Sequence, residues 1–569
     1  MALPVAQLDP RPLIRDLLDS YRTMEMPLDR YLKLYLLPMV LMAVMLAVIA
    51  VAAPDLPAWL RGLIAALGGF LPLAVLVMPK AKRDSQRRQI RQRFHLFLTH
   101  LTVLSMTNID RVEIFRTLAD TDEYLAIAEE MGHIVALVDT WNQSLDDACR
   151  MRAKKVPSPL LSDFLERLAY SIGAGQQISD FLIEEQDTMI QNFATRYESD
   201  LAKLDVMKEL FMSMMMAVSF LLSFAIILPV LTGINPMMPV MGVVGMFLLT
   251  EAGFLYGIHA SSPSDPLWFD SERRLPRDRR ILIVTSAAVV SSLLIMLILG
   301  VGVFFEIGTV TEIPLSILMA MPTTPFLIPG YIMGKQESRV RDRDKEFVSF
   351  IRALGAVETV KQTSTANVLA SLRRKDFGNL TQNIDNLYKR LNMRIDTTRS
   401  WRLFADETGS YLIQKFGDMY VFGRRLGGDP KALGNVISGN MNEVMTLREK
   451  RQQSTKTIVG VLYGLTAALV FAFFVSMEVV EMLLDITGDM DMLDEMGMQL
   501  LYTEGYDVLQ IRYMLLIVVL LNALFASIMI RVTDRGHFLN SLTHFTLLTW
   551  LGGLTAWVTA KVTAGAITV

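Results

Sequence analysis

Cysteine is nearly absent from this sequence, and charged residues are scarce. The 569 residues include a single cysteine, Cys149, and charged residues make up 20% of the chain, where soluble domains have about 25%. One cysteine forms no intrachain disulfide and no thiolate metal cage, which excludes a disulfide scaffold and a cysteine-based zinc or iron–sulfur protein. Hydrophobic residues reach 52%, and the mean hydropathy is +0.36. We therefore expect the apolar excess to lie in lipid.

Motifs for catalysis and for nucleotide or metal binding are also missing. The nearest approach to a phosphate-binding loop, residues 330–336, has one spacer residue too few and carries Gln336 where a Ser or Thr is required. The six histidines form no HExxH pair, and no glycine-rich loop follows a predicted strand. A net charge of -3 gives no overall reason to expect nucleic-acid binding. The sequence thus predicts neither an enzyme nor a protein with a cofactor, a metal site or a nucleic-acid partner.

Apolar runs of bilayer length determine the predicted architecture. A helix of about 20 residues crosses about 30 Å of hydrocarbon while satisfying its own backbone hydrogen bonds. About nine runs reach this length, which predicts an all-α, polytopic helical membrane protein. The sixth run contains four prolines, so we expect a kinked span there. The runs are residues 32–53, 58–78, 210–234, 237–259, 281–305, 313–333, 457–484, 513–531 and 542–564.

Basic residues beside the runs predict the orientation, since cytoplasmic flanks carry the excess of Lys and Arg. The segment 485–510 between the seventh and eighth runs is acidic and is expected outside the cell. The N-terminus is then cytoplasmic and the C-terminus external in a multi-pass cell-membrane protein. We find no apolar segment typical of a signal peptide in the first thirty residues, so we expect the first span to act as the insertion signal. The basic flanks include Arg22, Arg30, Lys33, Lys80, Lys82, Arg83, Arg273, Arg274, Lys335, Arg339, Arg531 and Arg535.

Two long polar stretches, residues 80–209 and 336–456, interrupt the spans, and each is the size of a small domain. Apolar residues recur in both at the i, i+3, i+4, i+7 spacing of a helix, beginning at Phe94 and at Phe347. We expect two cytoplasmic helical bundles. The predicted division is a cytoplasmic segment 1–31, spans 1–2 in 32–79, a first domain 80–209, spans 3–6 in 210–335, a second domain 336–456, and spans 7–9 in 457–569.

Each of the two polar stretches also contains a glycine-rich turn followed by a long polar helix. Residues 173–175 (GAG) precede a polar helix expected over 178–208, and residues 427–428 (GG) precede another over 430–456. Each polar helix runs directly into a span, and the two units repeat at a fixed interval, which is typical of a duplicated unit. An even number of crossings separates the copies, so both point the same way. A parallel repeat counts against the inverted-repeat transporters.

These features resemble the type II secretion F-domain family of membrane platform proteins, found in type II secretion, type IV pilus and archaeal filament machines. The helical unit from Phe94, the GAG turn with Ile178 after it, and the second copy from Phe347 carry the resemblance. Two F-like domains among about nine spans look like the platform of the archaellum, the archaeal flagellum.

The resemblance implies a non-enzymatic platform that docks a hexameric secretion ATPase on its cytoplasmic domains. It also implies coupling of that motor to the assembly of archaellin or pilin-like filament subunits, with rotation as a further output in the archaellum. Membrane lipid and a second copy of the chain, in a homodimer or higher homo-oligomer, complete the partners that it implies. The basic residues expected to meet the ATPase are Arg87, Arg88, Arg373, Arg374, Lys375, Arg424, Arg425 and Lys431.

One ionisable residue, Glu251, lies well inside a predicted span, where a charged group is costly. Pairing or helix packing and ion translocation both remain open for it. The basic character of the second stretch is explained equally by docking of an acidic partner and by attraction to anionic lipid headgroups. The competing hypotheses are a platform for an archaeal adhesion pilus or secretion system and, more distantly, a membrane transporter or a membrane-bound sensor.

Overall fold

The computed structural model describes residues 31, 38–40, 42–45, 58–263, 265–269, 276–305, 312–488 and 507–567. These residues form α-helices and short 3-10 helices, and their only β pairing is an isolated bridge between Trp268 and Ser410. The predicted all-α class is therefore confirmed. Most of the first predicted span, the N-terminal segment 1–31 apart from its last residue, and residues 489–506 of the acidic segment lie outside the described residues.

The chain divides into two compact units. The first contains the chain up to Met189 together with Leu426–Gly428. Phe94, Phe97 and Phe164 are buried at its centre, with the rings of Phe94 and Phe164 5.5 Å apart and edge to face. Its helices are α4 (Ala58–Ser105), α5 (Arg111–Ala119), η2 (Asp122–Tyr124), α6 (Ala126–Trp141), α7 (Leu145–Ala153), α8 (Pro159–Gly173) and the beginning of α9 (Ile178–Thr232).

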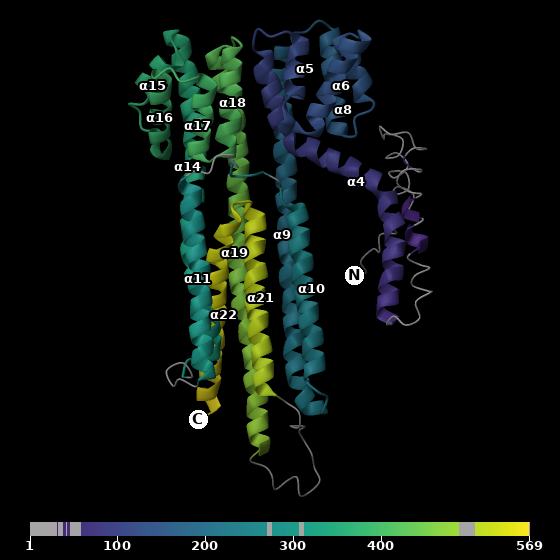
Figure 1. The fold of residues 1–569 in the computed structure, drawn as a ribbon, viewed down its shortest axis with the longest axis vertical. Coiled ribbons are helices and arrows are strands. Elements are labelled where there is room, and N and C mark those ends of the chain that lie inside the picture. Colours follow the sequence, from purple (N-terminus) through teal and green to yellow (C-terminus); the bar gives the residue numbers. More distant parts are fainter. Residues whose placement is uncertain are drawn as a thin grey trace. The chain divides into compact units, whose positions relative to one another are not determined.

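The second unit contains the rest of α9 and all later helices. Helices α15 to α18 gather around one end of α14, and α11 and α22 extend along its other end (Figure 1). Helix α21 packs on α22, and α10 packs on α21. The elements are α10 (Met237–Ser261), α11 (Pro276–Phe304), α13 (Leu315–Ala320), η3 (Met321–Phe326), α14 (Leu327–Lys361), α15 (Thr365–Leu372), η4 (Gly378–Leu380), α16 (Thr381–Asn392), α17 (Thr397–Thr408), α18 (Tyr411–Arg425), α19 (Pro430–Gly488), α21 (Val508–Asp534), η5 (Phe538–Asn540) and α22 (Ser541–Ile567).

The same order of elements occurs twice along the chain. A long helix, a short helix, a 3-10 turn, three helices and a second long helix follow one another in α4 to α9 and again in α14 to α19. Gly175 follows α8 and Gly427 follows α18, both at positive φ, +78° and +87°, where a side chain would be strained. Helices α9 and α19 begin at the predicted residues and continue unbroken into apolar sequence. This order supports the predicted duplication.

Six helices in the described part of the chain are long and apolar enough to cross a membrane. They match the third to eighth predicted runs, and the protein is a multi-pass membrane protein. The second predicted run forms the start of α4 and the ninth forms α22, but neither is among the six. The six are Ile178–Thr232, Met237–Ser261, Arg279–Phe304, Leu315–Lys361, Pro430–Leu484 and Val508–Asp534.

The sixth span is interrupted, as its prolines predict. Helix α13 gives way to the 3-10 turn η3, which carries Pro322 and Pro325, before α14 begins. The carbonyl of Pro322 accepts a hydrogen bond from Ser292 Oγ at 2.6 Å, and that of Thr323 accepts one from Thr546 Oγ1 at 3.0 Å. Irregular backbone is tolerated at membrane depth because neighbouring helices satisfy its polar groups in this way.

Helices α14 and α19 pack closely where both enter the second helical domain. A Cβ atom at Gly355 of α14 would overlap the carbonyl of Pro430, and one at Gly434 would lie 3.0 Å from the carbonyl of Ile351. Glycine on each helix therefore allows the two backbones to approach.

We expect Gly355→Ala to lower the free energy of unfolding by about 1–3 kcal/mol, because the added methyl group forces the two helices apart. The measurement is thermal unfolding of the purified full chain in detergent. Gly439→Ala is the matched control, since a Cβ there meets no atom within 4 Å and alanine is the better helix former. Equal destabilisation by the two variants would contradict the close contact.

Candidate functional site

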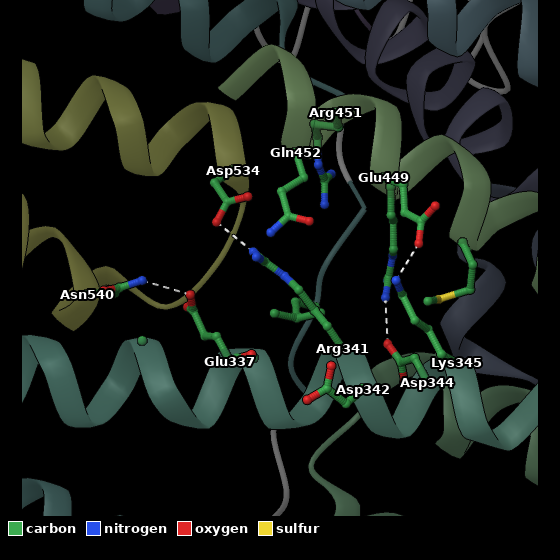
Figure 2. A pocket seen from close by; sticks show the side chains of 15 residues that line it. Glu337, Arg341, Asp342, Asp344, Lys345, Glu449, Arg451, Gln452, Asp534 and Asn540 are labelled. Atoms are coloured by element: carbon green, nitrogen blue, oxygen red, sulfur yellow. Dashed lines mark hydrogen bonds and ion pairs between the residues drawn. The ribbon is translucent and has the colours of Figure 1, made fainter. Parts of the chain in front are cut away.

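Charged side chains fill the space between α14 and α19 where both helices leave their apolar segments. They surround a polar cavity of about 220 Å³, which the connection between α21 and α22 also lines (Figure 2). Lys345 and Glu449 form an ion pair at 2.5 Å beside it. We call the charged residues of this region the ion-pair cluster: Asp265, Glu337, Arg341, Asp344, Arg448, Arg451, Arg531 and Asp534.

Arg448 of α19 is the centre of one half of the ion-pair cluster. Its Nε and Nη2 atoms donate to the two carboxylate oxygens of Asp265 at 2.6 and 2.8 Å, and Nη1 donates to Asp344 of α14 at 3.1 Å. Nη2 also donates to the carbonyl of Pro266 at 2.8 Å. Ser410, in the turn between α17 and α18, donates to the other oxygen of Asp344. One buried guanidinium thus joins α19, α14 and the α10–α11 connection, and Asp344 adds the α17–α18 turn.

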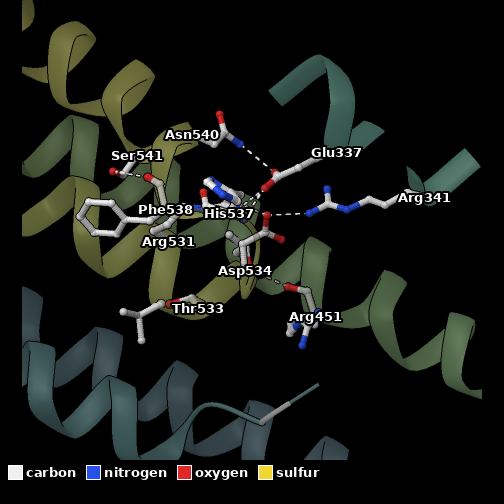
Figure 3. Close-up of polar contacts among 12 residues, drawn as sticks. Glu337, Arg341, Arg451, Arg531, Thr533, Asp534, His537, Phe538, Asn540 and Ser541 are labelled. Atoms are coloured by element: carbon white, nitrogen blue, oxygen red, sulfur yellow. Dashed lines mark hydrogen bonds and ion pairs between the residues drawn. The ribbon is translucent and has the colours of Figure 1, made fainter. Parts of the chain in front are cut away.

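Arg531, in the last turn of α21, is the centre of the other half (Figure 3). Its guanidinium pairs with Glu337 of α14, lies 3.2 Å from Asp534, and donates to the carbonyl of His537 at 2.6 Å. Glu337 also accepts hydrogen bonds from the backbone N–H of His537 at 2.5 Å and from Asn540 Nδ2 at 2.9 Å. The ring of contacts fixes the turn between α21 and α22 against α14.

The turn after α21 has the backbone that this packing requires. Gly536 lies so close to the Arg531 guanidinium and the Glu337 carboxylate that a Cβ atom would overlap both. Arg535 adopts a positive φ of 54° at the end of α21 and donates to the carbonyl of Ser262 at 3.0 Å. Burial and the nearby charge of Arg451 lower the pKa of the Arg535 guanidinium. Arginine remains charged after such a shift because its reference pKa is above 12.

The burial of these charges determines what the ion-pair cluster can do. Arg448 is 8% exposed, while the side chains of Asp344 and Glu337 are 1% and 2% exposed. Buried ion pairs add little net stability, but removing one partner leaves an uncompensated charge. The ion-pair cluster therefore imposes one arrangement of α14, α19, α21 and the α10–α11 connection, and it suits the transmission of a displacement between the helical domain and the membrane helices.

The predicted docking residues lie at several places on the domains. Arg88, Arg374, Arg425 and Lys431 are exposed, while Arg87 donates to the carbonyl of Pro157 at 2.7 Å. The other predicted residues also make contacts: Arg373 lies 3.7 Å from Asp385 and 4.7 Å from the ring of Tyr388, and Lys375 lies 5.3 Å from the ring of Phe377.

Arg424 has a structural role that the sequence did not indicate. Its guanidinium donates to the buried carboxylate of Glu358 at 3.1 Å, and the hydroxyl of Tyr420 donates to the other oxygen at 2.7 Å. Thr365 Oγ1 adds a hydrogen bond at 3.0 Å. Burial and the Glu358 charge raise the pKa of Tyr420, so its hydroxyl stays a donor. Arg424 therefore neutralises a charge inside the second domain.

Glu251 is buried within α10, and no hydrogen-bond partner for either carboxylate oxygen is present among the described residues. Cys149 is buried too, and burial raises the pKa of its thiol to about 12, which fits a neutral packing residue. In the described part of the chain, no group of three or more His, Cys, Asp or Glu side chains could hold a metal ion.

The ion-pair cluster was not predicted from the sequence, although the sequence contains one indication of it. Asp344 lies three residues before Phe347 on α14, and Arg448 lies four residues after Val444 on α19. Both positions fall on the buried apolar stripe of their helices, where a charge needs a partner. The identity of those partners depends on tertiary structure.

Comparison with known proteins gives two kinds of match. Residues 97–226 match the family described as type II secretion system (T2SS), protein F. The chain is 33% identical over 539 residues to the Flagella accessory protein J of Methanococcus voltae, covering 94% of this chain and 96% of that protein. It is 32% identical over 533 residues to the Flagella accessory protein J of Methanocaldococcus jannaschii, covering 92% and 94%. No solved structure gives a significant match.

We expect Arg448→Met to destabilise the second unit by about 3–5 kcal/mol, because Asp344 would remain buried without its cation and Asp265 would keep only the more distant Arg451, 3.9 Å away. Thermal unfolding of the full chain in detergent checks this. Adding Asp344→Asn should restore part of the loss, since it removes one of the stranded charges. Lys450→Met is the control, because the Lys450–Glu198 pair is half exposed and such pairs contribute about 1 kcal/mol or less. Similar losses in the two single variants would contradict the central role of Arg448.

Proposed function

The chain belongs to the flagella accessory protein J family and contains a type II secretion system protein F domain, and we propose that it is the membrane platform on which an archaellum is assembled and driven. Members of this family are structural membrane proteins of filament and secretion machinery and are not enzymes. In our proposal, a cytoplasmic hexameric secretion ATPase docks on the helical domains. Its movements are passed to the membrane helices, where filament subunits are inserted, and they also drive rotation.

The ion-pair cluster is the observation that supports this proposal most strongly. A platform must convert force on a cytoplasmic domain into movement of membrane helices. Helices α14 and α19 each run unbroken from the second domain into an apolar segment, and the ion-pair cluster fastens both to α21 and to the α10–α11 connection. A push on the second domain would therefore move several membrane helices together.

We place both helical domains in the cytoplasm, with the N-terminus inside and the C-terminus outside. The basic flanks motivate this orientation. A platform for an adhesion pilus or a secretion system is the alternative, and the names of the two relatives favour the archaellum.

We expect cysteine labelling to confirm this orientation. In a chain with Cys149→Ala, Asp491→Cys should react with a membrane-impermeant maleimide in intact cells, and Lys375→Cys should react only after lysis. Lysed cells provide the control that both cysteines are reactive. Labelling of Lys375→Cys in intact cells would refute the proposed orientation.

The structure refines the choice of docking residues. Arg373 and Arg424 make contacts within the second domain, so changing them would mix binding with stability. Arg374 and Lys431 are exposed, and their side chains have no ion-pair partner among the described residues. These two residues are therefore the cleaner probes of an acidic ATPase surface.

We expect Arg374→Glu with Lys431→Glu to slow association with the purified secretion ATPase at low salt by at least about tenfold, because like charges then repel at the docking surface. The effect should shrink as salt is added, because the screening length of exposed charges falls from about 8–10 Å at ordinary ionic strength to about 3 Å at 1 M. Stopped-flow association with the full chain in nanodiscs measures the rate.

The charge-matched control is Lys154→Glu with Lys155→Glu, which reverses two exposed lysines of the first domain. An association rate unaffected by the first pair and lowered by the control pair would move the docking surface to the first domain. Reduced binding to anionic vesicles, with unchanged association with the ATPase, would assign the basic residues to lipid instead.

A further inference from the structure

Glu251 is a carboxylic acid enclosed in the middle of a membrane-spanning helix. Its side chain is fully buried in α10, and neither of its oxygens has a hydrogen-bond partner among the described residues. Most of α10 is exposed and apolar, so the helix presents this one polar residue to the protein interior. A polar group placed there at such cost needs an explanation.

The surroundings of Glu251 are apolar. Phe247 lies one turn before it and packs edge to face on Phe473 of α19 with ring centroids 6.3 Å apart. Phe254, three residues after it, packs on Phe211 of α9 at 5.3 Å. These residues share one face of α10 with Glu251. The carboxyl group therefore points into the buried region shared by α9, α10 and α19.

Helix α21 brings a buried polar pair to this level. Helices α10 and α21 run in the same direction in Figure 1, and Ser262 Oγ donates to the carbonyl of Val532 at 3.1 Å. Glu251 lies eleven residues before Ser262, and Leu521 lies eleven residues before Val532. Glu251 is therefore level with Leu521 and with its neighbour Asn522. The Asn522 amide is buried and donates to Thr466 Oγ1 of α19 at 3.0 Å.

Charged groups on the packed helices flank the apolar segments, and several of them pair with other residues. Arg512 pairs with Glu481, and Arg531 pairs with Glu337. No ion pair to Glu251 occurs within the described residues. Within the apolar segments of these helices and the turns at their ends, the titratable and charged groups include Asp205, Lys208 and Glu209 on α9, Tyr256 and His259 on α10, Lys456, Tyr463, Glu478 and Glu481 on α19, Arg512, Tyr513, Arg531 and Asp534 on α21, and His544 and Lys561 on α22.

We propose that Glu251 is a proton-binding site of the membrane bundle, and that a proton on its carboxyl group allows α10 to pack against α9, α19 and α21. An unpaired carboxylate in apolar surroundings is strongly unfavourable, whereas the neutral acid costs much less. The proton comes from water when α10 joins the bundle and returns to water when α10 separates. Packing of α10 is thereby linked to pH, and this linkage rests on the bundle alone and holds whether or not the ATPase docks on the basic residues.

Infrared spectroscopy of the full chain in lipid nanodiscs tests the proposal. At neutral pH we expect a carbonyl band of a protonated carboxylic acid in the wild type and its loss in Glu251→Gln. The control is Glu312→Gln, because Glu312 is exposed, and it should leave the band in place. A wild-type spectrum without this band at neutral pH, or a band that persists in Glu251→Gln, would overturn the proposal.

Thermal unfolding at a series of pH values gives a second readout. The wild type should lose stability relative to Glu251→Gln as pH rises above the ordinary pKa of a glutamic acid, because only the wild type must take up a proton from water when α10 packs, and that uptake becomes less favourable as pH rises. At acidic pH the two should unfold at similar temperatures. Parallel pH dependence of the two proteins would contradict the proposal. If Glu251→Gln does not reach the membrane, Glu251→Met replaces it, since its side chain is of similar length and carries no charge at any pH.

Discussion

The second unit depends on the neutralisation of buried charge. Two guanidinium groups, Arg448 and Arg531, lie almost fully out of solvent, and each is paired with carboxylates from other elements. Water cannot solvate these buried positive charges, so the helices and connections that carry the carboxylates must be in place to neutralise them. The close contact of α14 with α19 at Gly355 and these ion pairs, with their defined hydrogen-bond geometry, favour the same register of the helices.

This constraint divides α14 into parts with different mechanical roles. From the ion-pair cluster to its end, α14 is held by α19 and by the domain around it. On the other side of the ion-pair cluster lies the interrupted segment η3, whose backbone carbonyls accept hydrogen bonds from side chains of α11 and α22. A displacement of the second domain would therefore be carried rigidly as far as the membrane boundary. We infer that it would be taken up at η3, where the backbone is already irregular and few helical hydrogen bonds must break.

The sequence predicted those features that depend on local chemistry. The starts of α9 and α19 follow from Gly175 and Gly427, whose positive φ ends the preceding helix, and the apolar periodicity located the helical domains. The ion-pair cluster was not predictable to the same degree, because Asp265 and Arg448 are separated by 183 positions. Arg424 is a residue for which the sequence predicts the wrong environment. Its charge predicts an exposed docking residue, whereas the fold places it beside the buried Glu358.

The two copies of the helical unit differ where the second is fastened to the membrane. When Phe94 is aligned with Phe347, and the start of α9 with the start of α19, Asp344 corresponds to Arg91 and Arg448 corresponds to Arg196. Both arginines of the first copy are exposed, and two cations cannot reproduce the pairing of Asp344 with Arg448. The repeated fold thus carries the buried linkage in its second copy. It follows that the two copies are not interchangeable, because the second holds a buried ion pair between its two long helices at positions where the first has two arginines.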